Sequence, residues 1–237
     1  MQIVILCGGK GTRLADVNGN LPKILTKFNN KTYLEILFDY LDNFDQIEEI
    51  ILLTGYGHDQ VQNKLDSITT NFKIKISKDL TLGGGGTKSI IDAAKLNLLK
   101  DDFVLIFGDS LPQFNIQETY KLFKDNKMDM LMTYISKNLV NEVSRINLEG
   151  NRITYSSKLN PHERFNFVDY GVTFFSLPVL KKYINNSDLD LKSFIELITE
   201  HYHVYGYEVI QPYLEFGNLD SYKIAHKKFE DLARKKF

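Results

Sequence analysis

The sequence has no tryptophan, a single cysteine and no long apolar run. Cys7 cannot form an intrachain disulfide, and its apolar surroundings are typical of a small core residue in a reducing compartment. The apolar runs at 3–7 and 103–107 are far shorter than the roughly 20 residues of a membrane-spanning helix. No basic segment precedes an apolar run at the start, so we expect no secretory signal peptide. These absences predict a cytoplasmic protein with no membrane partner.

An excess of charge of one sign is also lacking. The chain has 29 basic and 30 acidic residues, which leaves a formal net charge of −1. No global field therefore exists to hold nucleic acid, and any phosphate site must be local. The lysine-rich stretch 227–236 alternates with apolar residues and indicates a solvated amphipathic helix. We expect no nucleic-acid partner.

The length of 237 residues, without a linker or an internal repeat, favours a single domain spanning 1–237. In residues 1–136, strand patterns alternate with helix patterns. Strands are expected at 2–7, 47–53, 72–76, 103–107 and 129–135, and helices at 33–41, 58–68, 88–99 and 116–125. This alternation predicts right-handed crossovers and a Rossmann-like α/β fold, with a mainly parallel sheet flanked by helices.

The pattern changes in residues 137–237. Glu149-Gly150-Asn151 is a good hairpin turn between strands at 143–148 and 152–155. Further strands are expected at 166–175 and 204–210, and helices at 177–183, at 191–201 and from about 219. We interpret this half as a β-rich lid that completes a site on the parallel sheet.

A glycine-rich loop, Gly8-Gly9-Lys10-Gly11-Thr12-Arg13-Leu14, directly follows the first expected strand. In open α/β sheets ligands bind beyond the carboxyl ends of the strands, and glycines there let backbone N–H groups approach a phosphate. Arg13 adds a planar fork for phosphate oxygens, and Lys23 adds a second cation. Leu14 replaces the third glycine of a dinucleotide fingerprint, and Gly11 replaces the Ser or Thr of a P-loop. The loop therefore indicates an anion site outside both motifs.

Residues 6–14 together with Pro22-Lys23 resemble the signature of the sugar-1-phosphate nucleotidyltransferases, and the resemblance covers most of the chain. It implies the GT-A-like form of the α/β fold, with a nucleotide-binding core in 1–136. The sugar phosphate would then bind in 137–237. The resemblance also implies that Arg13 and Lys23 are catalytic cations, which neutralise the triphosphate and the sugar phosphate. Nucleotide contacts are implied for the first loop, at Leu6, Gly8, Gly9, Gly11, Thr12 and Arg13.

A second glycine run, Gly83 to Gly86, precedes the helix expected at 88–99. By itself it could be a flexible connector, although four glycines are costly to order and favour close backbone approach. The resemblance implies that the backbone of Gly83, Gly84, Gly85 and Gly86 packs on the nucleobase. Relatives usually have threonine where this chain has Gly84.

Gly108-Asp109-Ser110 follows the strand expected at 103–107. Taken alone, Asp109 is most simply a turn or helix-capping residue. The resemblance implies instead that Asp109 is catalytic and binds Mg²⁺, that Gly108 contacts the nucleotide and that Ser110 contacts the substrate. Glu215 is the implied second metal ligand; many relatives have aspartate there, and one branch has glutamate. Both acids offer the hard oxygen ligands that Mg²⁺ prefers.

Three further residues are implied to bind the sugar phosphate. Asp169 and Gly171 belong to Val168-Asp169-Tyr170-Gly171, which resembles the segment lining the sugar pocket, although Asp169 could equally be a polar residue at a strand end. Lys158 stands where relatives hold the sugar phosphate with a lysine, but Ser157 replaces the glutamate that usually precedes it. The histidines show no metal-ligand spacing except the pair His201 and His203, which is more typical of a surface.

The resemblance implies Mg²⁺-dependent transfer of a nucleoside monophosphate from a nucleoside triphosphate to a sugar 1-phosphate, with release of pyrophosphate. The motif combination is closest to the heptose or mannose 1-phosphate guanylyltransferase branch, which favours GTP. Its products usually serve capsule, lipopolysaccharide or other glycan synthesis in bacteria, and homo-oligomers are common among relatives.

Several alternatives stay open from the sequence. CTP, UTP or dTTP could replace GTP, and the acceptor could be a non-sugar phosphate or phosphonate. A catalytically silent homologue could sense nucleotide sugars as a regulatory subunit, although the retained Arg13, Lys23, Asp109 and Glu215 argue against it. A glycosyltransferase would be expected to carry an Asp-x-Asp motif after a central strand, where this chain has Asp109-Ser110-Leu111.

Overall fold

The computed structural model describes residues 1–79, 85–158 and 165–234. Within this part of the chain, one nine-stranded sheet has the order β5-β4-β1-β6-β11-β8-β12-β10-β9. Its strands are β1 (Gln2–Leu6), β4 (Glu49–Thr54), β5 (Lys73–Lys78), β6 (Asp102–Phe107), β8 (Met130–Ser136), β9 (Ile146–Glu149), β10 (Arg152–Tyr155), β11 (Phe167–Ser176) and β12 (Tyr205–Glu208). The strands expected from the sequence are therefore present, with small differences at their ends.

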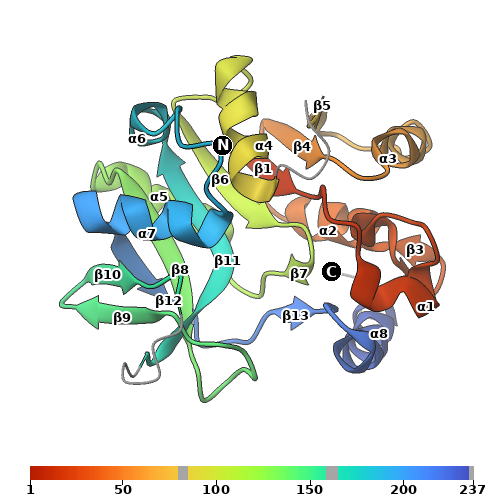
Figure 1. Ribbon diagram of the computed structural model, residues 1–237. Helices are drawn as coiled ribbons and strands as arrows, with labels where there is room; N and C mark the ends of the chain where they lie inside the picture. Colours follow the sequence, from red (N-terminus) through yellow and green to blue (C-terminus); the bar gives the residue numbers. More distant parts are fainter. Residues whose placement is uncertain (80–84, 159–164, 235–237) are drawn as a thin grey trace.

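Helices cover both faces of this sheet (Figure 1). The longer ones are α2 (Tyr33–Leu41), α3 (His58–Leu65), α4 (Gly85–Lys95), α5 (Ile116–Asp125), α6 (Leu177–Lys182), α7 (Leu191–His201) and α8 (Leu219–Arg234). One buried core joins the sheet to α2, α3, α5 and α8, and a second core joins it to α4, α6 and α7. No helix in the described ranges is long and apolar enough to cross a membrane.

Short elements that the sequence analysis did not expect lie near the strand ends. They are the 3-10 helices η1 (Thr12–Leu14) and η2 (Lys23–Leu25), the helix α1 (Ala15–Asn18), the hairpin of β2 (Lys27–Phe28) with β3 (Lys31–Thr32), and the pair of β7 (Ser110–Leu111) with β13 (Leu214–Glu215). Their two- to four-residue lengths are too short for a hydrophobic period to reveal.

Capping side chains account for where three of the predicted helices begin. Helix α2 begins at a capping box, in which Thr32 accepts from the Glu35 backbone N–H while the Glu35 carboxylate accepts from the Thr32 N–H. Asn115 caps α5 and Asp190 caps α7 through their side-chain oxygens. These caps stand directly before apolar residues at helical spacing, so both signals mark the same boundary.

The two halves of the chain share one sheet. Strands β1, β4, β5 and β6 are parallel to one another, as predicted. β11 then lies antiparallel beside β6 and β8, and the hairpin of β9 and β10 forms around Gly150 as expected. The β-rich second half therefore extends the parallel sheet as a mixed continuation. It supplies one wall of the cleft through the strands that follow β6.

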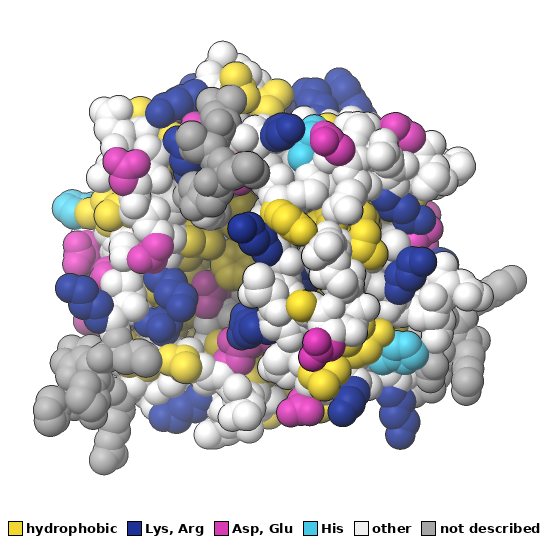
Figure 2. All heavy atoms as spheres, turned by 45° about the vertical axis from the view of Figure 1, so that its right-hand side comes forward, with side chains coloured by type: hydrophobic (Ala, Val, Ile, Leu, Met, Phe, Trp, Pro, Cys, Tyr) yellow, Lys and Arg dark blue, Asp and Glu magenta, His cyan; other side chains and the backbone are white. Residues whose placement is uncertain are grey.

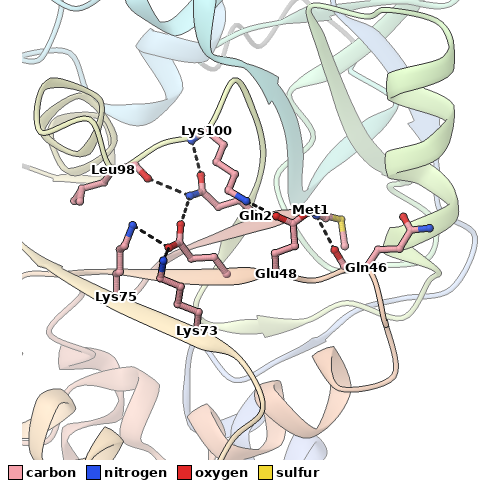
Figure 3. A network of polar contacts seen from close by, with 9 residues as sticks. Met1, Gln2, Gln46, Glu48, Lys73, Lys75, Leu98 and Lys100 are labelled. Carbon is pink, nitrogen blue, oxygen red and sulfur yellow. Dashed lines mark hydrogen bonds and ion pairs between the residues drawn. The ribbon is translucent and has the colours of Figure 1, made fainter.

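A polar network ties the ends of β1, β4 and β5 that lie farthest from the glycine loop (Figure 3). The Gln2 amide donates to Glu49 over 2.7 Å and to the Leu98 carbonyl over 3.1 Å, while its oxygen accepts from the Lys100 N–H. Lys75 approaches Glu49 to 2.8 Å, so the buried carboxylate is paired. This network closes that end of the sheet, and the cleft forms at the opposite ends of the strands.

The C-terminal helix is anchored on the first half of the chain. Phe229 of α8 meets the ring of Phe28 at 4.7 Å, and Phe28 meets Phe216 at 5.2 Å. The Tyr222 hydroxyl donates to the Lys27 carbonyl over 3.0 Å. In Figure 1, β13 leads into α8, which contacts β2. This aromatic packing carries the β13 segment, and Glu215 with it, to the glycine loop.

Candidate active site

The loops that follow neighbouring parallel strands meet at one edge of the sheet. The Gly108 N–H donates to the Leu6 carbonyl over 2.9 Å, and the Tyr56 N–H donates to the Gly8 carbonyl over 3.3 Å. The approach at Gly108 is so close that a Cβ there would lie 2.5 Å from the Leu6 oxygen. Cys7 is buried, as predicted, and its thiol donates to the Leu53 carbonyl. The loops after β1, β4 and β6 thus form a continuous floor.

A deep hollow opens above this floor, with hydrophobic side chains inside and both basic and acidic side chains at its edges (Figure 2). Two adjoining cavities occupy it in the described part of the chain. The first cavity, about 770 Å³, is bounded by the loop 6–10, the start of α4 and Gly108. The second cavity, about 700 Å³, is bounded by β11, the start of α7 and the β13 segment. Phe107, Asp109 and Leu191 line both, so Asp109 lies where the cavities meet.

Charged side chains converge at this junction. The Lys23 Nζ donates to Oδ2 of Asp109 over 2.9 Å. Glu215 is paired in register with Ser110, the residue after Asp109, across the short β7–β13 ladder. A Cβ on Gly217 would lie 3.1 Å from Oε2 of Glu215, 3.7 Å from the Lys23 Nζ and 4.0 Å from Nη2 of Arg13. Two cations and two carboxylates from four separate segments therefore surround one small space.

Lys23 is held in place by its neighbours. Its Nζ lies 5.2 Å from the centre of the Phe216 ring, a cation–π contact beneath the ion pair. Gly11 adopts φ +64°, and a Cβ there would lie 3.2 Å from the Lys23 Cβ. Gly11 lines neither cavity. A glycine is therefore explained at this position by the left-handed turn and by the close packing of the turn against Lys23.

A third carboxyl group, Glu142, was missed by the sequence analysis. It lines the second cavity close to Glu215 and Tyr213. Burial, and next the charge of Glu215, raise the pKa of Glu142 to about 7. Glu142 lies in an irregular segment between β8 and β9, and no residue pattern there distinguishes it from a solvated glutamate.

Basic side chains line the second cavity on its other sides. Arg13, Arg145 and Lys192 all border it, and none of them forms an ion pair with a described carboxylate. Nη1 of Arg145 donates to the carbonyls of Ser156 and Ser157 over 3.2 and 2.6 Å, which holds the guanidinium beside the cavity. Arg145 and Lys192 were also absent from the sequence prediction.

Asp169 and Gly171 occupy a break in the register of β11 against β8. Oδ1 of Asp169 accepts from the Gly171 N–H over 2.9 Å, and Gly171 adopts φ +84°. Burial raises the pKa of Asp169 to about 6, against the lowering effect of that N–H. The bulge turns both residues toward the second cavity.

Most of the predicted residues come together around the two cavities. Leu6, Gly8, Gly9, Lys23, Gly85, Gly86, Gly108 and Asp109 line the first. Arg13, Asp109, Ser110, Asp169, Gly171 and Glu215 line the second. Thr12, like Gly11, lines neither, because it begins η1 behind the loop. Lys158 is exposed and lines neither cavity, while Gly83 and Gly84 lie outside the described residues.

A metal cluster of three or more His, Cys, Asp or Glu side chains is absent from the described ranges 1–79, 85–158 and 165–234. His201 and His203 are both exposed, as the sequence predicted. The carboxylates at the junction thus number fewer than a closed structural metal site requires.

Comparisons with known proteins agree with this architecture. The chain is 24% identical over 239 residues to a D-glycero-alpha-D-manno-heptose 1-phosphate guanylyltransferase of Aneurinibacillus thermoaerophilus, with 97% of this chain and 99% of the relative covered. The protein of the same name from Campylobacter jejuni is 25% identical over 205 residues, with 85% and 86% covered. Both alignments span the two halves of the chain.

Solved structures share the fold. HddC from Yersinia pseudotuberculosis, complexed with GMP-PN, has a TM-score of 0.79 at 20% identity, covering 96% of this chain and 99% of that one. The inositol-1-phosphate CTP transferase from T. maritima has a TM-score of 0.77 at 17% identity, covering 97% and 96%. These likenesses confirm the α/β fold that the sequence predicted.

The profile of one family, described as nucleotidyl transferase, matches residues 2–231. The matched range includes the glycine loop, Asp109 and Glu215. The resemblance to nucleotidyltransferases is confirmed: the chain belongs to the nucleotidyl transferase family of enzymes.

Proposed function

We propose that this enzyme transfers a nucleoside monophosphate from a nucleoside triphosphate to a sugar 1-phosphate and releases pyrophosphate. The observation that carries the proposal is the meeting of the two cavities at Asp109, with Lys23, Arg13 and Glu215 gathered there. A transfer between two bound substrates requires two adjoining sites and a charged centre between them. GTP and a heptose or hexose 1-phosphate are the first candidates.

The first cavity suits the triphosphate. The loop 8–10 presents backbone groups beyond the end of β1, and Lys10 and Lys23 line the same space. The second cavity suits the acceptor, because the unpaired Arg13, Arg145 and Lys192 border it together with several hydrogen-bonding groups. The acceptor phosphate would attack the α-phosphorus from the side of the second cavity. Its oxygen is already ionised, so the reaction needs charge neutralisation and positioning more than a general base.

Asp109 and Glu215 fit a Mg²⁺ site, because both supply oxygen ligands at the junction and Mg²⁺ is often held by one or two carboxylates plus substrate phosphates and water. Mg²⁺ bound there would neutralise charge that develops on the transferred phosphoryl group. Lys23 orients Asp109 through its 2.9 Å bond. Arg13 faces the same space from η1 and balances the charge of the acceptor phosphate.

The choice of GTP and a heptose rests on the names of the two guanylyltransferase relatives, and such products would serve surface polysaccharide synthesis. CTP, UTP and dTTP are alternative donors. The alternative without catalysis is a silent sensor of nucleotide sugars. The presence of all four charged residues at the junction argues against it.

The proposal is tested by pyrophosphate release in the presence of Mg²⁺. GTP, CTP, UTP, dTTP and ATP are each paired with a panel of heptose and hexose 1-phosphates. Release with one pair would support the transfer and name both substrates. Nucleotide binding without release from any pair would favour the sensor or a non-sugar acceptor. The absence of both binding and release would contradict the assignment of the first cavity.

A further inference from the structure

We infer that Asp79 recognises the base of the nucleotide by hydrogen bonding and makes the first cavity selective for guanine. This inference rests on the proposed nucleotide site and adds the residue that chooses among bases. Asp79 directly follows β5 and lines the first cavity together with Gly86 and Ser89. None of the sequence motifs drew attention to it.

The backbone holds Asp79 firmly at the edge of the cavity. Its N–H donates to the Thr54 carbonyl over 2.7 Å, which continues the parallel pairing of β5 with β4. The hydroxyl of Ser89, a buried residue of α4, donates to Oδ1 over 2.5 Å. The carboxylate is therefore fixed from two elements, as a recognition group should be.

The second carboxylate oxygen is directed along the cavity floor. A Cβ on Gly55 would lie 2.5 Å from Oδ2, and a Cβ on Gly8 would lie 3.4 Å from it. No ion pair or hydrogen-bond donor among the described residues engages Oδ2. Lys88 acts on this half-buried carboxylate without forming an ion pair with it, and burial raises the pKa of the group. Donors from a ligand would satisfy it.

Asp79 is separate from the phosphate-binding charges. The charged groups that act on it are Asp92 and Lys88, and neither Lys10 nor Lys23 is among them. Within the cavity lining, Lys23 is paired with Asp109, whereas Asp79 lies near the start of α4 and accepts from Ser89. A nucleotide has the matching order, since its phosphates are anionic and its base carries N–H donors.

Guanine is the base whose chemistry fits this acceptor. Its N1–H and N2 amino group are adjacent donors, and an ionised carboxylate accepts two such bonds side by side. Uracil and thymine present one N–H between two carbonyl oxygens. Cytosine and adenine present an amino group beside an unprotonated ring nitrogen. Each of these places an acceptor against the carboxylate, which is a repulsive contact.

The test compares bases that differ at single atoms. Dissociation constants for GTP, ITP, XTP and UTP are measured by calorimetry with the wild-type protein and Asp79→Asn. ITP lacks the N2 amino group, and XTP has an oxygen in its place. We expect the wild type to bind GTP about 10- to 100-fold more tightly than ITP. We expect Asp79→Asn to lose that preference and to bind XTP more tightly than the wild type, because the amide can donate to the xanthine oxygen.

Ser89→Ala is the matched control, because it removes the hydrogen bond to Oδ1 and keeps the carboxylate. It should weaken all four nucleotides by similar factors and keep the ratio of GTP to UTP. An equal loss for all four nucleotides in Asp79→Asn, or no gain for XTP, would overturn the inference and leave Asp79 a structural residue.

Pyrophosphate release is followed with the same proteins, so that the two proposals can fail separately. If the wild type releases pyrophosphate and Asp79→Asn has the same base preference as the wild type, only the inference that Asp79 recognises guanine is rejected. Selective, Asp79-dependent binding of GTP without release from any sugar phosphate would reject the transfer and support the base recognition.

Discussion

The two cavities of the cleft are built in contrasting ways. The first has five glycines in its lining, whose backbone carries no side chain, at the ends of adjacent parallel strands and at the start of α4. The second is formed by side chains such as Glu142, Arg145, Asp169 and Lys192, which come from segments far apart in the chain. A backbone-built pocket needs glycines at fixed places in one loop. A side-chain pocket needs only that the fold bring suitable residues together, so its sequence leaves few traces.

The two cavities also differ in the pairing of their charged side chains. In the first cavity the carboxylate of Asp109 is paired with Lys23. In the second, burial raises the pKa values of Glu142 and Asp169, while Arg13 and Arg145 lack ionic partners among the described residues. Such a mixture of donors and acceptors suits a hydroxyl-rich, phosphorylated acceptor. Variants at the junction and in each cavity test this difference.

The largest effect is expected at the junction. Asp109→Asn should lower kcat by about 10³-fold or more in the presence of Mg²⁺, because it removes a charged oxygen ligand and the partner of Lys23. Asp102→Asn is the control, since Asp102 lies at the other end of β6 and pairs with Lys124. Circular dichroism should show both variants folded. Near-normal turnover in Asp109→Asn would remove the metal assignment.

Arg13→Ala should lower kcat/KM by about 10²- to 10³-fold, because its guanidinium faces Glu215 and Lys23 across the reacting space. Steady-state kinetics with each substrate varied in turn separate the two constants. A loss seen only in KM would make Arg13 a binding residue and leave charge neutralisation to Lys23.

Arg145→Ala probes the side-chain-built cavity. It should raise KM for the acceptor about tenfold and leave KM for the nucleoside triphosphate unchanged. Arg152→Ala is a close control, because Arg152 lies on the same hairpin and donates to the Thr199 carbonyl outside both cavities. Equal changes in the acceptor KM of the two variants would show that Arg145 only stabilises the hairpin.

Gly9→Ala probes the backbone-built cavity. A Cβ at this position meets nothing within 4 Å, so the thermal unfolding temperature should not change. If the loop wraps phosphates, the added methyl group should raise KM for the triphosphate by about three- to tenfold and leave the acceptor KM as it was. An unchanged triphosphate KM would show that Gly9 does not approach the phosphates.

The smallest effect concerns stability against pH. Burial raises the pKa of Asp169 to about 6 from 3.8, so the folded protein binds more protons than the unfolded chain between about pH 4 and 6. Its contribution to stability is present below pH 4 and lost as the pH rises through 6. Asp169→Asn should therefore stabilise the fold by about 1–2 kcal/mol at pH 7, at the cost of acceptor binding.

Urea unfolding at pH 4, 6 and 7 measures this difference. Asp190→Asn is the opposite case, because the Ser193 N–H lowers the pKa of Asp190 at the start of α7. That variant should lose more stability at pH 7 than at pH 4, because the stabilising charge disappears as the pH falls toward the pKa of this carboxyl group. If the free energies of unfolding of Asp169→Asn and of the wild type differ by the same amount at every pH, the raised pKa of Asp169 is contradicted.

Much of the architecture could be predicted from the sequence because its signals are local. Helices α2, α5 and α7 carry caps next to apolar periodicity, and the first loop carries its glycines in an unbroken run. Glu215 was predicted only through family resemblance, since nothing in its own neighbourhood distinguishes it. Lys158 was also predicted only through that resemblance, and it lies exposed outside both cavities, so its role stays a prediction.

By itself, the sequence determined that the first strands form a parallel sheet and that a glycine-rich loop carrying Arg13 follows the first of them. These follow from hydrophobic period, glycine placement and the chemistry of single residues. Only the tertiary structure decided that Glu142 and Arg145 border the second cavity and that Oδ2 of Asp79 lies beside Gly8 and Gly55. Those relationships depend on contacts between segments distant in the chain, which packing creates and no local pattern records.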